Sequence, residues 1–172
     1  MRDGIILDTS FLITLADSRR DRHGVAKQFF QHFLTSRQPM FLSAIVVAEF
    51  CIRQTLETLP LQQLILLPFT HEDAMVAASF DFKSMAAGSG TDRQSLKDDL
   101  KIIGHAHARG LGYVITDDAE TMFEYCETLR KSGRTHLRGI KLQGGFSLEA
   151  FTPDGQKDFP IVMESQAEYQ AE

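Results

Sequence analysis

Four places along the chain carry acidic residues where a carboxylate is costly. Asp8 is the only charged residue between residues 3 and 17, and Glu49 is the only one from residue 38 to residue 52. The other two places are adjacent pairs, Asp98–Asp99 and Asp117–Asp118. A carboxylate in apolar surroundings is disfavoured unless it is paired or binds a metal. These acids are therefore the first candidates for a functional site.

Two of the acids also have a structural interpretation. Asp8 follows a short apolar run and is a good N-cap for a helix that begins there, so for this residue alone both interpretations stay open. Glu49 stands four residues before Arg53, and such a pair on an exposed helix is worth only about 0.3–0.5 kcal/mol. That is a weak reason to place a carboxylate in an apolar run, so we favour a functional Glu49.

Spacing separates the members of the two pairs. Ser95 and Asp98 have the spacing of a helix capping box, which would occupy Asp98 and leave Asp99 for the site. Asp117 lies three residues before Glu120 in a second box-like arrangement, which leaves Asp118 as the freer acid. We therefore predict Asp99 and Asp118 as site acids, with Asp98 and Asp117 as the alternatives one residue away.

Hydrophobic periodicity predicts strands that alternate with helices. Short apolar runs predict strands at residues 4–7, 40–47, 64–68, 113–115 and 139–142. Helices are predicted from residue 11, from residue 25, over 48–58, 71–84 and 95–109, and within 116–129, with a loop at 85–94. No amphipathic period follows residue 144. Alternating strands and helices indicate an α/β fold with a parallel sheet.

Such a sheet would bring the acids to one edge. Asp8, Glu49 and Asp118 come just past predicted strands, and Asp99 begins a helix that precedes one. Ligands of open parallel sheets bind beyond the carboxyl ends of the strands. Four converging carboxylates repel one another and need cations, and all-oxygen ligation favours Mg²⁺ or Mn²⁺ over zinc. Magnesium held by carboxylates binds substrate phosphates, which indicates phosphoryl or phosphodiester chemistry.

Composition and charge set the limits on this interpretation. The 172 residues, 43% of them hydrophobic, fit one compact domain, and a net charge of −5 argues against a protein that coats nucleic acid non-specifically. No stretch is apolar enough for a membrane span or a signal peptide, so we expect a cytoplasmic protein with no membrane partner. Cys51 and Cys126 lack metal-ligand spacing and are predicted to be small buried residues.

The motifs around the acids resemble those of the PIN-domain nucleases, which include the VapC-type toxins of bacterial toxin–antitoxin pairs. The matching pieces occur in the family's order: ILDTS at 6–10, LSAIVVAEF at 42–50, DLKIIGHA at 99–106 and GLGYVITDD at 110–118. Residues 139–142 resemble the family's last strand. Each motif alone is weak, but four in order are fairly specific.

The resemblance implies a Rossmann-like PIN domain over residues 1–145, with a parallel sheet flanked by helices, and a C-terminal extension at 146–172. It implies a Mg²⁺- or Mn²⁺-dependent endoribonuclease that cleaves single-stranded or structured RNA with a water whose pKa the metal lowers. It implies an antitoxin protein and a second copy of the chain as candidate partners. The site residues carried over are the metal acids Asp8, Glu49, Asp99 and Asp118, with Thr116 as the hydroxyl beside them.

Three other functions compete with this interpretation. A haloacid-dehalogenase-like phosphatase needs a second Asp where this chain has Ser10, and a phosphoreceiver domain needs an early pair of acids that is missing. A non-catalytic PIN-like module that binds nucleic acid or protein is the stronger alternative, although the presence of all four acids argues against it. His105 and His107 are predicted to be structural or surface residues. Cations near the substrate could come from residues 18–23, Arg93, Lys97 and Lys101.

Overall fold

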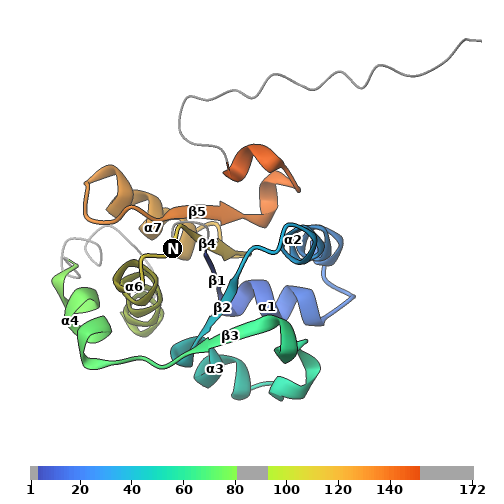
Figure 1. Ribbon diagram of the computed structural model, residues 1–172, viewed down its shortest axis with the longest axis horizontal. Helices are drawn as coiled ribbons and strands as arrows, with labels where there is room; N and C mark the ends of the chain where they lie inside the picture. Colours follow the sequence, from blue (N-terminus) through green and yellow to red (C-terminus); the bar gives the residue numbers. More distant parts are fainter. Residues whose placement is uncertain (1–3, 81–92, 152–172) are drawn as a thin grey trace, which may run out of the picture.

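The computed structural model describes residues 4–80 and 93–151 of the chain. Five strands, all parallel to their neighbours, form one sheet in the order β3-β2-β1-β4-β5 (Figure 1). The strands are β1 (Ile5–Leu7), β2 (Met40–Ser43), β3 (Leu64–Leu67), β4 (Tyr113–Thr116) and β5 (Arg138–Lys141). The predicted parallel α/β architecture is confirmed.

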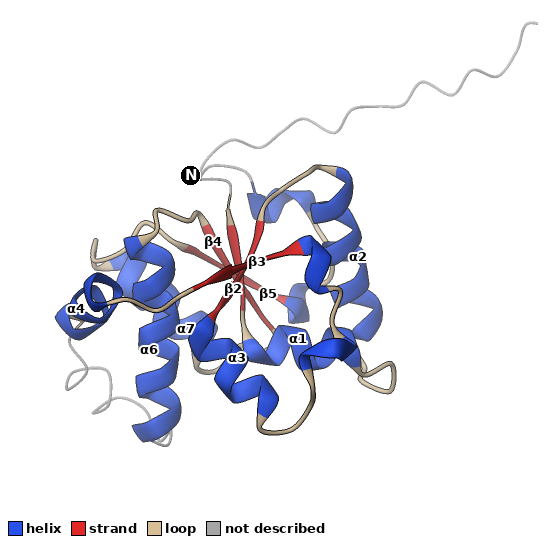
Figure 2. Ribbon diagram, turned by 60° about the horizontal axis from the view of Figure 1, so that its bottom comes forward, coloured by secondary structure: helices blue, strands red, loops and turns tan. Residues whose placement is uncertain are grey.

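Helices cover both faces of the sheet. They are α1 (Thr9–Ala16), α2 (His23–Thr35), α3 (Ala44–Cys51), α4 (His71–Ser79), α6 (Arg93–Ala108) and α7 (Met122–Lys131), with short 3-10 turns at Leu56–Thr58, Leu61–Gln63, Leu142–Gly144 and Leu148–Phe151. α1 and α2 lie on one side of the sheet and α4, α6 and α7 on the other (Figure 2). α3 contacts both α1 and α6. The acids are thus carried by elements that meet around the central strands.

The central strands are apolar because both faces of the sheet are covered. All three residues of β1 are buried, as are all four of β2. The helices contribute the large buried side chains that pack on the sheet, among them Phe11, Phe29, Phe33 and Phe50. Continuous apolar runs are typical of parallel strands in this setting. β1 and β4, whose ends carry two of the acids, are therefore held rigidly.

Two predicted boundaries are wrong in ways that bear on the site. The strand expected at 40–47 ends at Ser43, because the Ser43 hydroxyl accepts a hydrogen bond of 3.1 Å from the Ile45 amide and caps α3. Glu49, which was expected in the first turn of a helix over 48–58, therefore lies in the second turn of a helix that ends at Cys51. The helix expected from residue 95 begins at Arg93, so Ser95 lies inside the helix rather than at its N-cap.

Other boundaries differ less. The helix expected over 71–84 ends at Ser79, and residues 81–84 lie outside the described part of the chain. Of the loop expected at 85–94, the last two residues belong to α6 and the rest lie outside the described residues. Cys126 is buried as predicted, whereas the prediction for Cys51 is wrong, because it is exposed at the C-terminal end of α3.

The first residues of the predicted C-terminal extension pack against the domain. Phe146 and Phe151 make edge-on ring contacts with Phe29 of α2, at centroid distances of 5.0 and 6.2 Å. The Tyr113 hydroxyl donates a hydrogen bond of 2.9 Å to the Phe151 carbonyl. Residues 152–172 lie outside the described part. Within that part, the helices are too short or too polar to cross a membrane.

Candidate active site

The four predicted site acids line one pocket at the carboxyl ends of the central strands. β1 stands between β2 and β4, so the chain leaves β1 and β4 in opposite directions and opens a crevice beyond them. The pocket has a volume of about 350 Å³ and is lined by Asp8, Thr9, Ser10, Ile13, Glu49, Ile52, Arg53, Asp99 and Asp118. Asp98 and Asp117, the alternatives one residue away, are not among its lining residues.

Asp8 is both the N-cap of α1 and a wall of the pocket. Its Oδ2 accepts hydrogen bonds from the Ser10 amide at 3.2 Å, the Ser10 hydroxyl at 2.5 Å and the Thr116 hydroxyl at 2.8 Å. Burial raises the pKa of Asp8, while the hydrogen bonds from Ser10 and Thr116 act to lower it. The two interpretations of Asp8 therefore do not exclude each other, because one oxygen makes all of these contacts.

Ser10 and Thr116 form the centre of a hydroxyl network beneath the acids. Their hydroxyl oxygens are 2.9 Å apart. The Asp117 amide donates to Ser10 Oγ at 2.8 Å, and the Asp118 amide donates to Thr116 Oγ1 at 2.8 Å. Thr116 was predicted beside the acids, but Ser10 was not. Its position two residues after an N-cap Asp was the available signal.

Glu49 reaches the pocket from the second turn of α3. Its carboxylate accepts a hydrogen bond from the Thr9 hydroxyl of α1. Burial raises the pKa of Glu49, the Thr9 bond lowers it, and the nearby charges of Asp8 and Asp98 raise it further. The contact that the structure shows for Glu49 is thus with the neighbouring helix of the site. Arg53, its predicted structural partner, lines the same pocket.

The adjacent residues Asp98 and Asp99 have different surroundings. Asp98 forms an ion pair of 2.7 Å with Lys101. Asp99 lines the pocket, and its Oδ2 is buried with no hydrogen-bond partner in the described part of the chain. Burial, together with the charges of neighbouring acids, raises the pKa of Asp99 to about 8, although a bond from Thr121 opposes the shift. Asp98 has a structural partner in Lys101, although the helix begins before the expected cap.

Asp117 and Asp118 are divided in a similar way. Asp117 forms an ion pair with Arg22, and its Oδ2 accepts a hydrogen bond of 2.7 Å from Thr14. Asp118 lines the pocket, while its Oδ1 accepts the Thr121 amide at 2.8 Å. The box-like arrangement predicted between Asp117 and Glu120 is therefore wrong. Asp117 is engaged by residues more than 90 positions away, and Asp118 caps the turn before α7.

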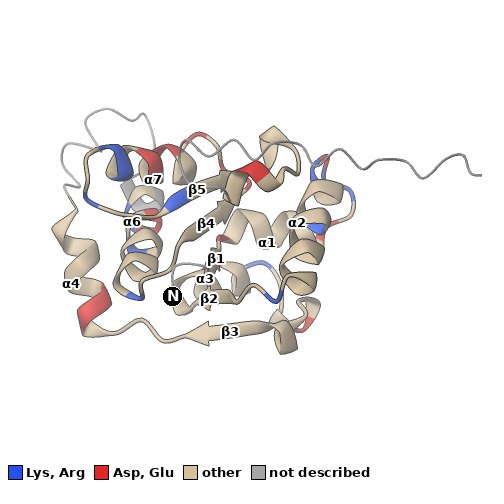
Figure 3. Cartoon of the chain, turned by 45° about the horizontal axis from the view of Figure 1, so that its top comes forward, with Lys and Arg blue, Asp and Glu red and all other residues tan. Residues whose placement is uncertain are grey.

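The predicted cations and histidines are largely engaged elsewhere. Arg19 pairs with Asp17 at 2.9 Å, and Arg22 with Asp117. Both arginines come just before α2 in the chain. Figure 3 shows basic residues in blue beside α2. The basic residue of the pocket itself is Arg53, which was considered only as a partner of Glu49. His105 is buried and His107 partly buried; neither lines the pocket, as expected for structural residues.

The acids are the kind of donors that could hold an oxygen-preferring cation such as Mg²⁺ or Mn²⁺. As the side chains stand, no group of three or more Asp, Glu, His or Cys residues within 4–80 and 93–151 is arranged to hold a metal ion. Asp8, Glu49 and Asp118 are each turned to a neighbouring hydroxyl. Because Mg²⁺ commonly takes only one or two carboxylates plus water, the buried Oδ2 of Asp99 and its neighbours still fit such a cation.

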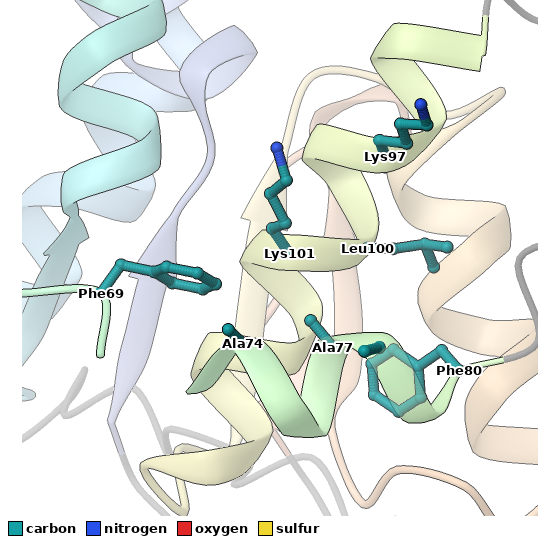
Figure 4. Close-up of a pocket in the computed structure, with 8 residues that line it drawn as sticks. Phe69, Ala74, Ala77, Phe80, Lys97, Leu100 and Lys101 are labelled. Atoms are coloured by element: carbon teal, nitrogen blue, oxygen red, sulfur yellow. The ribbon is translucent and has the colours of Figure 1, made fainter. Parts of the chain in front are cut away.

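A second, apolar hollow lies between α4 and α6. Figure 4 shows Phe69, Ala74, Ala77, Phe80 and Leu100 around it, with Lys97 and Lys101 at its rim. Its volume is about 270 Å³. It contains no acid, so it does not belong to the carboxylate pocket. Leu100 and Lys101 line this hollow, whereas Asp99 lines the carboxylate pocket.

Comparisons with known proteins place the fold but not the family. No protein-family model matches the sequence, and no curated protein matches it. Among solved structures, VapBC2 from Rickettsia felis bound to a DNA fragment from its promoter matches 80% of this chain and 98% of its own, with a TM-score of 0.56 and 14% identity.

Two other solved structures match in the same way. FitAcB from Neisseria gonorrhoeae matches 81% of this chain and 98% of its own, with a TM-score of 0.56 and 18% identity. DNA-bound VapBC from Salmonella typhimurium matches 83% and 99%, with a TM-score of 0.52 and 20% identity. At these identities the likeness concerns the fold alone. The chain has the PIN-domain fold that its motifs predict.

Proposed function

We propose that the chain is a Mg²⁺- or Mn²⁺-dependent endoribonuclease. The observation that carries the proposal is the convergence of Asp8, Glu49, Asp99 and Asp118 on one pocket at the edge of the parallel sheet. Bringing one buried and three partly buried carboxylates together without a cation is unfavourable. The raised pKa of Asp99, to about 8, is the direct sign of that cost. A site built this way gains most from a bound divalent cation.

One or two of the four acids would hold the cation directly and the others would hold it through water, while Ser10 and Thr116 would keep Asp8 in position. When bound, the cation would lower the pKa of a water and neutralise negative charge at a phosphodiester. Thr116 and Ser10 fix the Asp8 carboxylate by hydrogen bonds of 2.8 and 2.5 Å, so that it need not reorient during the reaction. Arg53, in the pocket lining, supplies a positive charge for an RNA phosphate.

Asp99 would exchange a proton when the site is loaded. With a pKa of about 8, its carboxyl is mostly protonated at neutral pH in the absence of a cation. A cation binds the carboxylate form, so binding releases this proton. The affinity for the cation should therefore rise with pH through the range in which Asp99 ionises.

We also propose that the chain acts with a partner protein as the toxin of a toxin–antitoxin pair. The support is the PIN-domain fold shared with the VapBC complexes and the four motifs that resemble those of VapC-type toxins. A small open reading frame next to the gene would supply the candidate partner. Co-expression should then yield a complex in which RNA cleavage is suppressed.

The test of the catalytic proposal is cleavage of a labelled, mixed-sequence single-stranded RNA by the purified chain. Cleavage should require Mg²⁺ or Mn²⁺ and should stop in EDTA. Asp99→Asn, purified in the same way, is the control for contaminating ribonuclease and should be inactive. Cleavage that survives EDTA, or that equals wild type in Asp99→Asn, contradicts the proposal. Inertness towards varied RNAs with Mn²⁺ present would favour a non-catalytic binding module.

A further inference from the structure

A buried chain of polar side chains lies behind the carboxylate pocket. Ser43 Oγ is 2.9 Å from His105 Nδ1, and His105 Nε2 is 3.6 Å from Asp73 Oδ2. The exposed fractions of Ser43, His105 and Asp73 are 0%, 0% and 1%. Substrate has no access to a serine buried in this way. The hydroxyl, imidazole and carboxylate therefore act by joining parts of the protein.

The three residues belong to three different parts of the fold. Ser43 ends β2 and caps α3. His105 lies in α6. Asp73 belongs to the capping box of α4, where its Oδ2 accepts the Thr70 amide at 2.7 Å, and it is also bonded by Arg109 at 2.7 Å. The hydrogen bond of His105 thus connects the last turn of α6 to the start of α3, while Asp73 at the start of α4 is a close charged neighbour whose 3.6 Å distance is too long for a hydrogen bond.

The two residues of the Ser43–His105 hydrogen bond are each six positions along the chain from a site acid. Ser43 is six residues before Glu49 along α3, and His105 is six residues after Asp99 along α6. Six helical residues span about 9 Å. The two helices therefore pass each other in opposite directions, joined by Ser43 and His105 at one end and bringing Glu49 and Asp99 into the same pocket at the other.

We propose that His105 is a positioning residue that sets α3 against α6 and thereby sets the spacing of Glu49 and Asp99. The expected effect on RNA cleavage rests on the proposed function, whereas the expected effect on the position of α3 does not. Nothing in the carboxylate pocket itself bonds α3 to α6 in the described residues. Within the described residues, the hydrogen bond of the Glu49 side chain is with Thr9 of α1.

The hydrogen-bond pattern favours one tautomer of His105. The Ser43 oxygen accepts the Ile45 amide at 3.1 Å, which leaves its hydroxyl hydrogen for His105 Nδ1. Nδ1 then accepts and Nε2 carries the proton, 3.6 Å from Asp73 Oδ2 and without a hydrogen-bond partner in the described residues. The other tautomer would aim a lone pair at that carboxylate. Burial lowers the pKa of His105 and keeps the ring neutral, against the opposing effects of the Asp73 charge and the Pro68 carbonyl.

Close packing prevents the helices from adjusting independently. A Cβ at Gly104 would lie 2.6 Å from the Ala77 Cα, so the backbones of α4 and α6 are in direct contact beside His105. Figure 4 shows Ala74 and Ala77 of α4 turned towards α6. With α4 fixed in this way, loss of the hydrogen bond between His105 and Ser43 leaves α3 as the element that is free to shift.

The test compares His105→Phe with His107→Phe. Both residues lie on α6, and both use Nδ1 to bond a hydroxyl, Ser43 at 2.9 Å and Thr135 at 3.0 Å. The first measurement is hydrogen exchange of the α3 amides, which needs no activity. His105→Phe should speed exchange there by at least about tenfold, and His107→Phe should not. Unchanged α3 exchange in His105→Phe would overturn the proposal.

The second measurement is RNA cleavage below the melting temperature of each variant. His105→Phe should lower kcat by at least about tenfold while KM stays within about twofold, because acids move but phosphate contacts do not. His105→Asn keeps a hydrogen-bond acceptor near the Nδ1 position, so its kcat should lie between those of His105→Phe and wild type. If His105→Phe does not fold, His105→Asn takes its place in both measurements. Equal losses in the His105 and His107 variants would overturn the proposal. If wild type does not cleave, the proposed function fails and hydrogen exchange alone decides.

Discussion

The Thr116 hydroxyl donates a hydrogen bond of 2.8 Å to Asp8 and so joins the carboxyl ends of β1 and β4. These strands are neighbours in the sheet, although 108 positions separate the two residues. The same oxygen accepts the Asp118 amide at 2.8 Å. One buried hydroxyl therefore holds one site acid directly and positions the backbone of another.

Thr116→Val should damage both stability and activity. Valine has nearly the same shape but leaves the Asp8 oxygen and the Asp118 amide without this partner. The loss should be about 1–3 kcal/mol of unfolding free energy, measured by urea denaturation. Thr116→Ser keeps the hydroxyl and should cost clearly less. Destabilisation by Ser that equals or exceeds that by Val would show that the methyl group matters at least as much as the hydroxyl.

Asp98→Asn and Asp99→Asn should have opposite consequences for cleavage. Asp98 is paired with Lys101 near the surface, so its replacement should cost at most about 1 kcal/mol and leave metal-dependent cleavage intact. Asp99→Asn should abolish cleavage, because Asp99 lines the pocket. Rates on labelled RNA with Mn²⁺ decide this. The reverse pattern would mean that the site uses Asp98.

The metal-free protein should lose stability as pH rises, through Asp99. Its pKa is raised from 3.8 to about 8, so the folded state keeps a proton that the unfolded chain releases. The stability from this group is fully present below pH 3.8 and is lost as pH rises through about 8. In EDTA, Asp99→Asn should therefore match wild type near about pH 5 and melt a few degrees higher near about pH 9.

Thermal melts at both pH values, with and without Mn²⁺, test this expectation. Mn²⁺ should raise the wild-type midpoint at about pH 9 and raise that of Asp99→Asn much less. A stability difference that is the same at both pH values would show that the Asp99 carboxyl does not titrate differently in the folded and unfolded states.

Arg22→Ala should destabilise the protein far more than Arg19→Ala. Arg22 pairs with Asp117, whose side chain is only 5% exposed, so its loss leaves a buried carboxylate with Thr14 and weaker partners. The cost should be about 1–3 kcal/mol. Arg19 and Asp17 form an exposed pair, and its loss should cost less than about 1 kcal/mol. Equal urea midpoints for the two variants would contradict this account.

Gly104→Ala and Gly24→Ala should change stability in opposite directions. At Gly104 the new Cβ would lie 2.6 Å from the backbone of α4, which should cost about 1–3 kcal/mol. At Gly24, within α2, the Cβ meets nothing within 4 Å, and alanine should stabilise by about 0.4–1 kcal/mol. Stabilisation by Gly104→Ala would show that α4 and α6 separate easily.

The sequence by itself determined the elements and the candidate acids. Local patterns suffice for this: apolar runs specify buried parallel strands, and isolated charges such as Asp8 and Glu49 stand out inside them. The choice of Asp99 over Asp98 and of Asp118 over Asp117 also agrees with which residues line the pocket. Single-residue boundaries were less accurate, as at Ser43, because a capping hydroxyl can end a strand inside an apolar run.

Only the tertiary structure determined which residues bond to each acid and hold it in position. The partners of Asp117, Arg22 and Thr14, lie 95 and 103 positions away, and no local spacing encodes them. The Ser43–His105 connection spans 62 positions and depends on how α3 passes α6. The raised pKa of Asp99 likewise arises from burial and from charges that three other elements bring near it. Such effects follow from distances in space, which the sequence fixes only through the whole fold.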